Sequence, residues 1–196
     1  MRRTAPIIAL AALLTAGAHA PDREAPPYPY VVFAPGGRFY FRMMTDPLAE
    51  HFDREKGSGG VYEVGPYGVD RVLWRIDGWY AFTTFLSSDG GFLVRLGNHP
   101  RGWSPSDSDL AVAFYRRGGG ASADTGILLK SYSTRTLIED DTKVEPTRSH
   151  YEFIAGIPGL VDPNGYIFEL VTVDRIRYLF DIRTGEMIAK ERGGTR

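Results

Sequence analysis

The stretch FLSSDGGFLVRLG, from Phe85 to Gly97, reads as a strand, a tight turn and a second strand. Bulky apolar residues flank the turn on both sides. Asp89-Gly90 within it is a strong hairpin signal, because glycine readily adopts the positive φ that a primed turn requires. An earlier stretch, VFAPGGRFYFRM from Val32 to Met43, has the same order of strand, glycine turn and strand. The chain therefore contains at least two copies of one hairpin pattern.

The two copies align residue by residue. Gly37 to Met43 and Gly90 to Leu96 share a glycine, a phenylalanine and an arginine at equivalent positions, and most other positions are apolar in both. A weaker third copy begins at SHYEFIAG, turns through DPNG (Asp162 to Gly165) and carries an insertion. We interpret the three hairpins as copies of one structural unit.

Each opening hairpin is followed by a second pair of apolar segments around a turn. The chain therefore divides into three units of four short strands, and a four-stranded antiparallel unit repeated about every 50 residues is typical of β-propeller blades. We expect an all-β fold built from blade-like units near residues 29–76, 79–132 and 149–190.

Two short sequence motifs resemble those of a known family. FLSSDGGFLV contains S-x-D-G and FDIRTGEMI contains D-x-x-T-G, and both resemble the hairpin motifs of β-propeller-type repeats in exported bacterial proteins. The resemblance implies a propeller-like arrangement. Closed propellers typically have four to eight blades, whereas this chain provides three units. Either two chains complete a ring as a homodimer, or the units form an open, twisted stack of sheets or a sandwich.

One short helix is expected between the first two hairpin strands and the third. Asp46 can cap it, Pro47 suits its first turn, and Gly57 can end it. The pattern predicts a helix near residues 47–56.

The N-terminus has the features of an export signal. Arg2 and Arg3 precede the apolar run from Ile7 to Leu14, and small residues follow, so that cleavage fits after Ala20 or, alternatively, after Ala18. The apolar run is shorter than the ~20 residues that a membrane-spanning helix needs. We expect an exported protein, periplasmic or secreted, that does not span the membrane after cleavage. The expected division is a signal peptide (1–20), a Pro-rich leader (21–28) and one β-rich domain (29–196).

The composition argues against a nucleic-acid-binding protein and against a fold held by disulfide bonds. The chain has 24 acidic against 23 basic residues, so it lacks the basic excess that usually accompanies nucleic-acid binding. It has no cysteine, so burial without disulfides must hold the fold. Eleven Tyr, eleven Phe and three Trp supply large apolar surfaces for that burial.

Catalytic and metal-binding motifs are absent from the sequence. It contains no G-x-S-x-G, P-loop or H-E-x-x-H. His51, His99 and His150 lie far apart in the chain, without the close spacing of many zinc ligands, so we expect separate surface or loop histidines. Two acidic runs, SDSD and EDD, lack the pattern of a calcium-binding EF-hand loop. We expect no metal and no cofactor.

A long polar loop is the best candidate binding site. GNHPRGWSPSD follows the second hairpin and brings an imidazole, a guanidinium and an indole together, and loops on a rigid β scaffold are usual places for binding. Carboxylates follow at its end. The candidate residues are His99, Arg101, Trp103, Asp107 and Asp109.

These observations favour a non-enzymatic, exported β-repeat protein that binds a partner protein or an envelope component, such as a glycan, through its loops. The alternative is a carbohydrate- or peptide-directed hydrolase or sensor that uses the aromatic and acidic loop 97–109. Glycosidases generally use two carboxyl groups about 5–10 Å apart, and Asp107 and Asp109 could supply such a pair. A purely structural role in a closed dimer is a third hypothesis.

Overall fold

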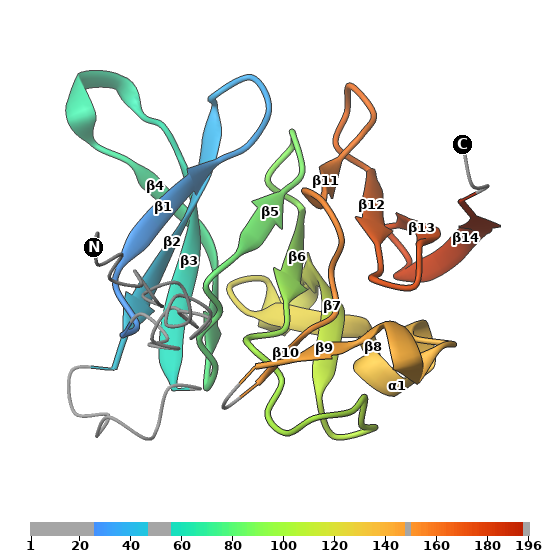
Figure 1. Ribbon diagram of the computed structural model, residues 1–196. Helices are drawn as coiled ribbons and strands as arrows, with labels where there is room; N and C mark the ends of the chain where they lie inside the picture. Colours follow the sequence, from blue (N-terminus) through green and yellow to red (C-terminus); the bar gives the residue numbers. More distant parts are fainter. Residues whose placement is uncertain (1–25, 47–55, 148–149, 194–196) are drawn as a thin grey trace, which may run out of the picture.

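A computed structural model describes residues 26–46, 56–147 and 150–193 of the chain. The described residues form three four-stranded antiparallel sheets and one two-stranded ribbon. Figure 1 shows the three larger sheets side by side in chain order, coloured from blue through green to red. Each of them joins neighbouring strands in sequence order, and none of the described sheets closes into a barrel. The expected all-β fold of three four-stranded units is confirmed.

The first sheet consists of β1 (Tyr30–Phe33), β2 (Phe39–Thr45), β3 (Gly57–Glu63) and β4 (Arg71–Asp77), with a 3₁₀ turn at Pro66–Gly68. The second consists of β5 (Thr84–Leu86), β6 (Phe92–Leu96), β7 (Leu110–Arg117) and β8 (Gly126–Ser133), with a 3₁₀ turn at Gly120–Ser122. The third consists of β11 (Gly159–Leu160), β12 (Ile167–Val171), β13 (Ile176–Asp181) and β14 (Glu186–Arg192).

A connecting segment links the second and third sheets. It contains α1 (Thr134–Leu137), a 3₁₀ turn (Asp141–Lys143), and the ribbon of β9 (Glu145–Pro146) with β10 (Tyr151–Glu152). Ser133 caps α1, since its hydroxyl accepts a hydrogen bond from the Thr136 N–H at 3.1 Å. The sequence did not indicate this helix. The helix expected near 47–56 lies outside the described residues except for its last position, as do the expected signal peptide and the start of the Pro-rich leader.

The turns repeat one geometry in all three sheets. Gly37, Gly90 and Gly165 have φ of +71°, +68° and +67°, and each donates its N–H to the carbonyl of the residue three positions earlier at 3.0 Å. A side chain at these positions would be strained, because L-residues rarely adopt this φ. The glycines that the sequence analysis aligned therefore close equivalent turns.

The second sheet is buried on both faces. Its β7 residues Val112 and Phe114 belong to a hydrophobic cluster shared with the third sheet, whereas Ala113 and Tyr115 belong to a cluster shared with the first. Successive side chains on a strand point to opposite faces. This explains why β7 reads as a continuous apolar run rather than as an alternating one.

Hydrogen bonds of the turn between β5 and β6, which contains Asp89 and Gly90, link the three sheets. The Trp74 indole N–H of β4 donates to the Gly90 carbonyl at 2.8 Å. On the other side, the Tyr166 hydroxyl donates to Asp89 Oδ2 at 2.9 Å, and the Ser88 hydroxyl to the Asn164 carbonyl at 2.6 Å. The second sheet is thus bonded to both neighbours through one turn.

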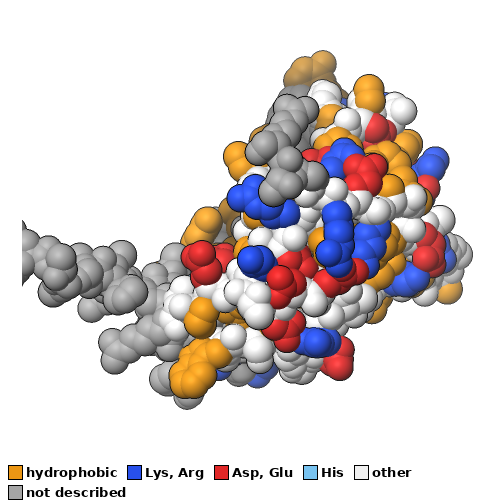
Figure 2. Space-filling view, turned by 45° about the vertical axis from the view of Figure 1, so that its right-hand side comes forward, with side chains coloured by type: hydrophobic (Ala, Val, Ile, Leu, Met, Phe, Trp, Pro, Cys, Tyr) orange, Lys and Arg blue, Asp and Glu red, His pale blue; other side chains and the backbone are white. Residues whose placement is uncertain are grey.

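The surface carries charges of both signs close together. On the face seen in Figure 2, lysines and arginines lie next to aspartates and glutamates rather than in one basic region. Arg177, for example, donates to Glu169 and Glu191 across the third sheet at 2.7 and 2.9 Å. None of the described helices is long and apolar enough to cross a membrane.

We predict that Phe114→Ala destabilises the protein by about 3–5 kcal/mol, because a buried phenylalanine leaves a cavity when truncated. Phe114 is fully buried, and its ring lies 5.2 Å from that of Phe180 in the third sheet. Urea unfolding measures the effect. Phe33→Ala is the matched control, because Phe33 is 59% exposed; equal losses in both variants would contradict the layered core.

Candidate functional site

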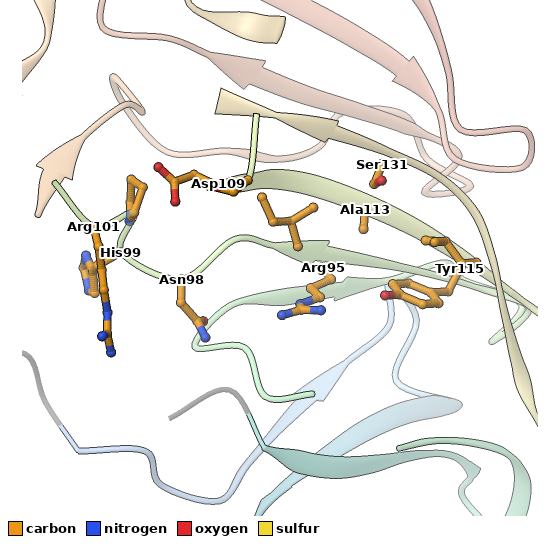
Figure 3. A pocket seen from close by; sticks show the side chains of 12 residues that line it. Arg95, Asn98, His99, Arg101, Asp109, Ala113, Tyr115 and Ser131 are labelled. Carbon is orange, nitrogen blue, oxygen red and sulfur yellow. The ribbon is translucent and has the colours of Figure 1, made fainter. Parts of the chain in front are cut away.

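A pocket of about 380 Å³ opens over β6, β7 and β8 and the loop that follows β6. Figure 3 shows side chains of the strands and of the loop surrounding it. The lining residues are Arg95, Asn98, His99, Pro100, Arg101, Ser108, Asp109, Leu110, Ala113, Tyr115, Leu128 and Ser131. The pocket thus combines one face of the central sheet with the predicted candidate loop.

Strand register builds the floor of the pocket. Arg95 on β6 is paired with Ala113 on β7, and Ala113 is paired with Ser131 on β8. Directly paired residues place their side chains on the same face of a sheet. The small side chains of Ala113 and Ser131 leave space in front of the sheet, next to the long side chain of Arg95.

Arg95 is the unusual residue of this floor. It lies on the face that carries the buried cluster shared with the first sheet, and its guanidinium lies 4.5 Å from the centre of the Trp79 ring. Its Nε is buried without a hydrogen-bond partner. Among the described residues, no carboxylate pairs with it. An N–H group that is buried without a hydrogen-bond partner destabilises a folded protein, and Arg95 as a whole is half-buried and lines the pocket.

The pocket wall is held in place by hydrogen bonds. The side chain of Asn98 donates to the Tyr80 carbonyl at 3.0 Å and accepts from the Phe82 N–H at 3.2 Å. These contacts attach the start of the loop to the segment before β5. His99 and Arg101 follow directly and lie beside each other at one end of the pocket in Figure 3.

Asp109 is the single acidic residue among the described lining residues, and its carboxylate already accepts a hydrogen bond within the protein. The Tyr151 hydroxyl donates to its Oδ2 at 3.0 Å. Burial, assisted by this carboxylate, raises the pKa of Tyr151 to about 12, so the phenol stays protonated and keeps donating. With Arg95 and Arg101 against Asp109, the pocket carries an excess of positive charge.

The five candidate residues divide into two groups. His99, Arg101 and Asp109 line the pocket, whereas Trp103 and Asp107 do not. Trp103 is 75% exposed on the loop, and Asp107 accepts a hydrogen bond from the Ser133 hydroxyl at 3.4 Å. Sequence reasoning missed Arg95 and Tyr115, which lie within strands. The available signal was an arginine inside the apolar strand FLVRL.

His99 also belongs to a group of three described residues that could hold a metal ion, with His150 and Glu152. The rings of His99 and His150 lie 4.7 Å apart between centroids, and His150 is only 6% exposed. The expectation of separate surface histidines is therefore wrong for this pair. Their separation along the chain gave no signal, because the fold alone brings the two segments together.

No protein-family model matches the chain, and no curated protein matches it in sequence.

We predict that Arg95→Met keeps or raises the free energy of unfolding, by up to about 2 kcal/mol, because it removes a buried N–H group that has no hydrogen-bond partner and retains an apolar chain over Trp79. Urea unfolding of the ligand-free protein measures the change.

Arg42→Met is the matched control. Arg42 occupies the equivalent position of the first hairpin, but its guanidinium lies 4.9 Å from the centre of the Tyr62 ring and donates to the Tyr62 hydroxyl at 2.8 Å. This variant should be neutral or slightly destabilised. A loss of more than about 2 kcal/mol in Arg95→Met would show that Arg95 serves stability instead.

Proposed function

We propose that the protein is a non-enzymatic binding protein whose pocket takes a carboxylate-bearing group of a partner protein or envelope component. The observation that carries this proposal is Arg95 in the pocket floor, whose Nε has no hydrogen-bond partner and which forms no ion pair among the described residues. Arginine binds carboxylates through two parallel hydrogen bonds, and this pairing is among the strongest in proteins. A ligand carboxylate would supply the charge that the described residues do not.

The size and lining of the pocket support a small group rather than a long chain. A volume of about 380 Å³ is at the lower end of the usual range for ligand sites. Asn98, Ser108 and Ser131 offer neutral hydrogen-bonding groups, and Tyr115 offers an aromatic surface. One acidic sugar residue or one acidic side chain fits this chemistry.

Trp103 supports binding to a larger partner. Its indole is 75% exposed on the loop that also carries Arg101, and exposed tryptophans are frequent hot spots of protein interfaces. In this proposal the pocket binds the carboxylate and Trp103 contacts the surface around it.

The geometry favours binding over hydrolysis. Glycosidases of the usual kind need two carboxyl groups facing the substrate, and Asp109 is the single acidic residue among the described residues of the lining. Asp107 does not join it there. A hydrolase or sensor acting through loop 97–109 therefore stays the alternative hypothesis.

Isothermal titration calorimetry tests the proposal with two matched ligand pairs, glucuronate against glucose and N-acetyl-glutamate amide against N-acetyl-glutamine amide. We expect at least one acidic member to bind at least tenfold more tightly than its neutral counterpart, and added salt to weaken it. Arg95→Met should abolish the preference, whereas Arg42→Met should retain it.

The two ligand pairs distinguish an acidic glycan from an acidic peptide as the source of the carboxylate. If neither acidic ligand binds at millimolar concentration, or if acidic and neutral members bind equally, the proposed function is wrong.

A further inference from the structure

Three possible metal ligands converge beside the pocket. Glu152 Oε1 lies 3.3 Å from His150 Nε2 and 3.9 Å from His99 Nδ1. The ligand atoms of the three side chains all lie within 4.8 Å of one another. His99 belongs to the loop after β6, His150 immediately precedes β10, and Glu152 ends it.

Backbone contacts hold the two segments together. Arg101 and His150 form an isolated antiparallel bridge, and the Tyr151 N–H donates to the Pro100 carbonyl at 3.2 Å. The positions of His99 and Glu152 therefore depend on hydrogen-bonded backbone rather than on two independent loops. Such support from a fixed scaffold is what a metal site needs.

Thr147 contacts the Nδ1 side of the His150 ring. The Thr147 hydroxyl donates to the His150 carbonyl at 2.8 Å, and its oxygen lies 3.1 Å from the imidazole Nδ1. In the tautomer with the proton on Nδ1, that N–H donates to the hydroxyl and Nε2 presents its lone pair. Metal-binding histidines commonly have their other ring nitrogen held in this way.

His150 Nε2 and Glu152 Oε1 face each other at 3.3 Å. In the tautomer with the proton on Nδ1, both atoms present electron pairs, and a cation between them would bind to both. Glu145 is the cross-strand partner of Glu152 in the ribbon, so a second carboxylate adds to the negative potential. No lysine or arginine among the described residues forms an ion pair with Glu152.

We propose that His99, His150 and Glu152 bind a zinc ion. Two imidazoles and one carboxylate are a common set of three protein ligands for zinc, with a fourth position left for water or a ligand. Ligand atoms around tetrahedral zinc lie about 3.4 Å apart, as follows from bond lengths of about 2.1 Å. The side chains of His99 and Glu152 are 41% and 56% exposed, so both can rotate by the small amount needed to close on the ion.

The zinc site shares His99 with the carboxylate pocket, but its test does not depend on that pocket, because Arg95 is not a zinc ligand and zinc binding requires no organic ligand. Arg95→Met should therefore keep its zinc affinity even if the proposed function is wrong.

Calorimetric titration of the purified protein with zinc chloride tests the site, using protein without a polyhistidine tag. We expect one zinc ion per chain with micromolar or tighter affinity, reversed by a chelator. His99→Gln and Glu152→Gln should each weaken binding at least tenfold, and thermal melting without metal should show that both variants remain folded.

One matched variant provides the control. Glu145→Gln removes the same charge from the neighbouring strand and should change zinc affinity less than threefold. Absence of zinc binding, or an equal loss in Glu145→Gln and Glu152→Gln, would overturn the proposal.

Discussion

Burial of the second sheet on both faces is the constraint on which the rest of the structure depends. β7 sends Phe114 toward the third sheet and Tyr115 toward the first, so each neighbouring sheet buries its own apolar face only because the second sheet lies between them. The chain has no disulfide, and large aromatic side chains supply much of the buried area. Without the central sheet, both hydrophobic clusters would be exposed to water. The stabilisation that scales with their buried apolar area would then be lost.

The candidate site arises where this layered packing is incomplete. Most of the central sheet faces a neighbour, but in front of Ala113 and Ser131 the side chains are too small to fill the space. Arg95 occupies the edge of that space, with its guanidinium against Trp79. A strand position between the apolar residues Val94 and Leu96 here carries a charged side chain, and local departures of this kind are frequent at functional sites.

Much of the architecture could be predicted from local signals. Gly37, Gly90 and Gly165 close turns with the positive φ that the sequence indicated, and the three four-stranded units follow from apolar segments separated by such turns. α1 was missed because four residues are too few to show a helical period. The candidate loop was found because polar and aromatic residues gather in it, but Arg95 was overlooked because it is a single residue within an apolar strand.

The sequence by itself determined most of the strands, their turns and the three four-stranded units, because these depend on side-chain alternation and on glycine, which act between near neighbours in the chain. The start of the third unit was wrong: SHYEFIAG contributes β10 to the separate ribbon, and the third sheet begins at β11. Only the tertiary structure decided which faces meet, that Arg95 lies over Trp79, and that His99 and His150 lie together. Those contacts depend on the stacking of whole sheets and on the backbone bridge between Arg101 and His150. No spacing along the chain records such distances, because the packing of distant segments sets them.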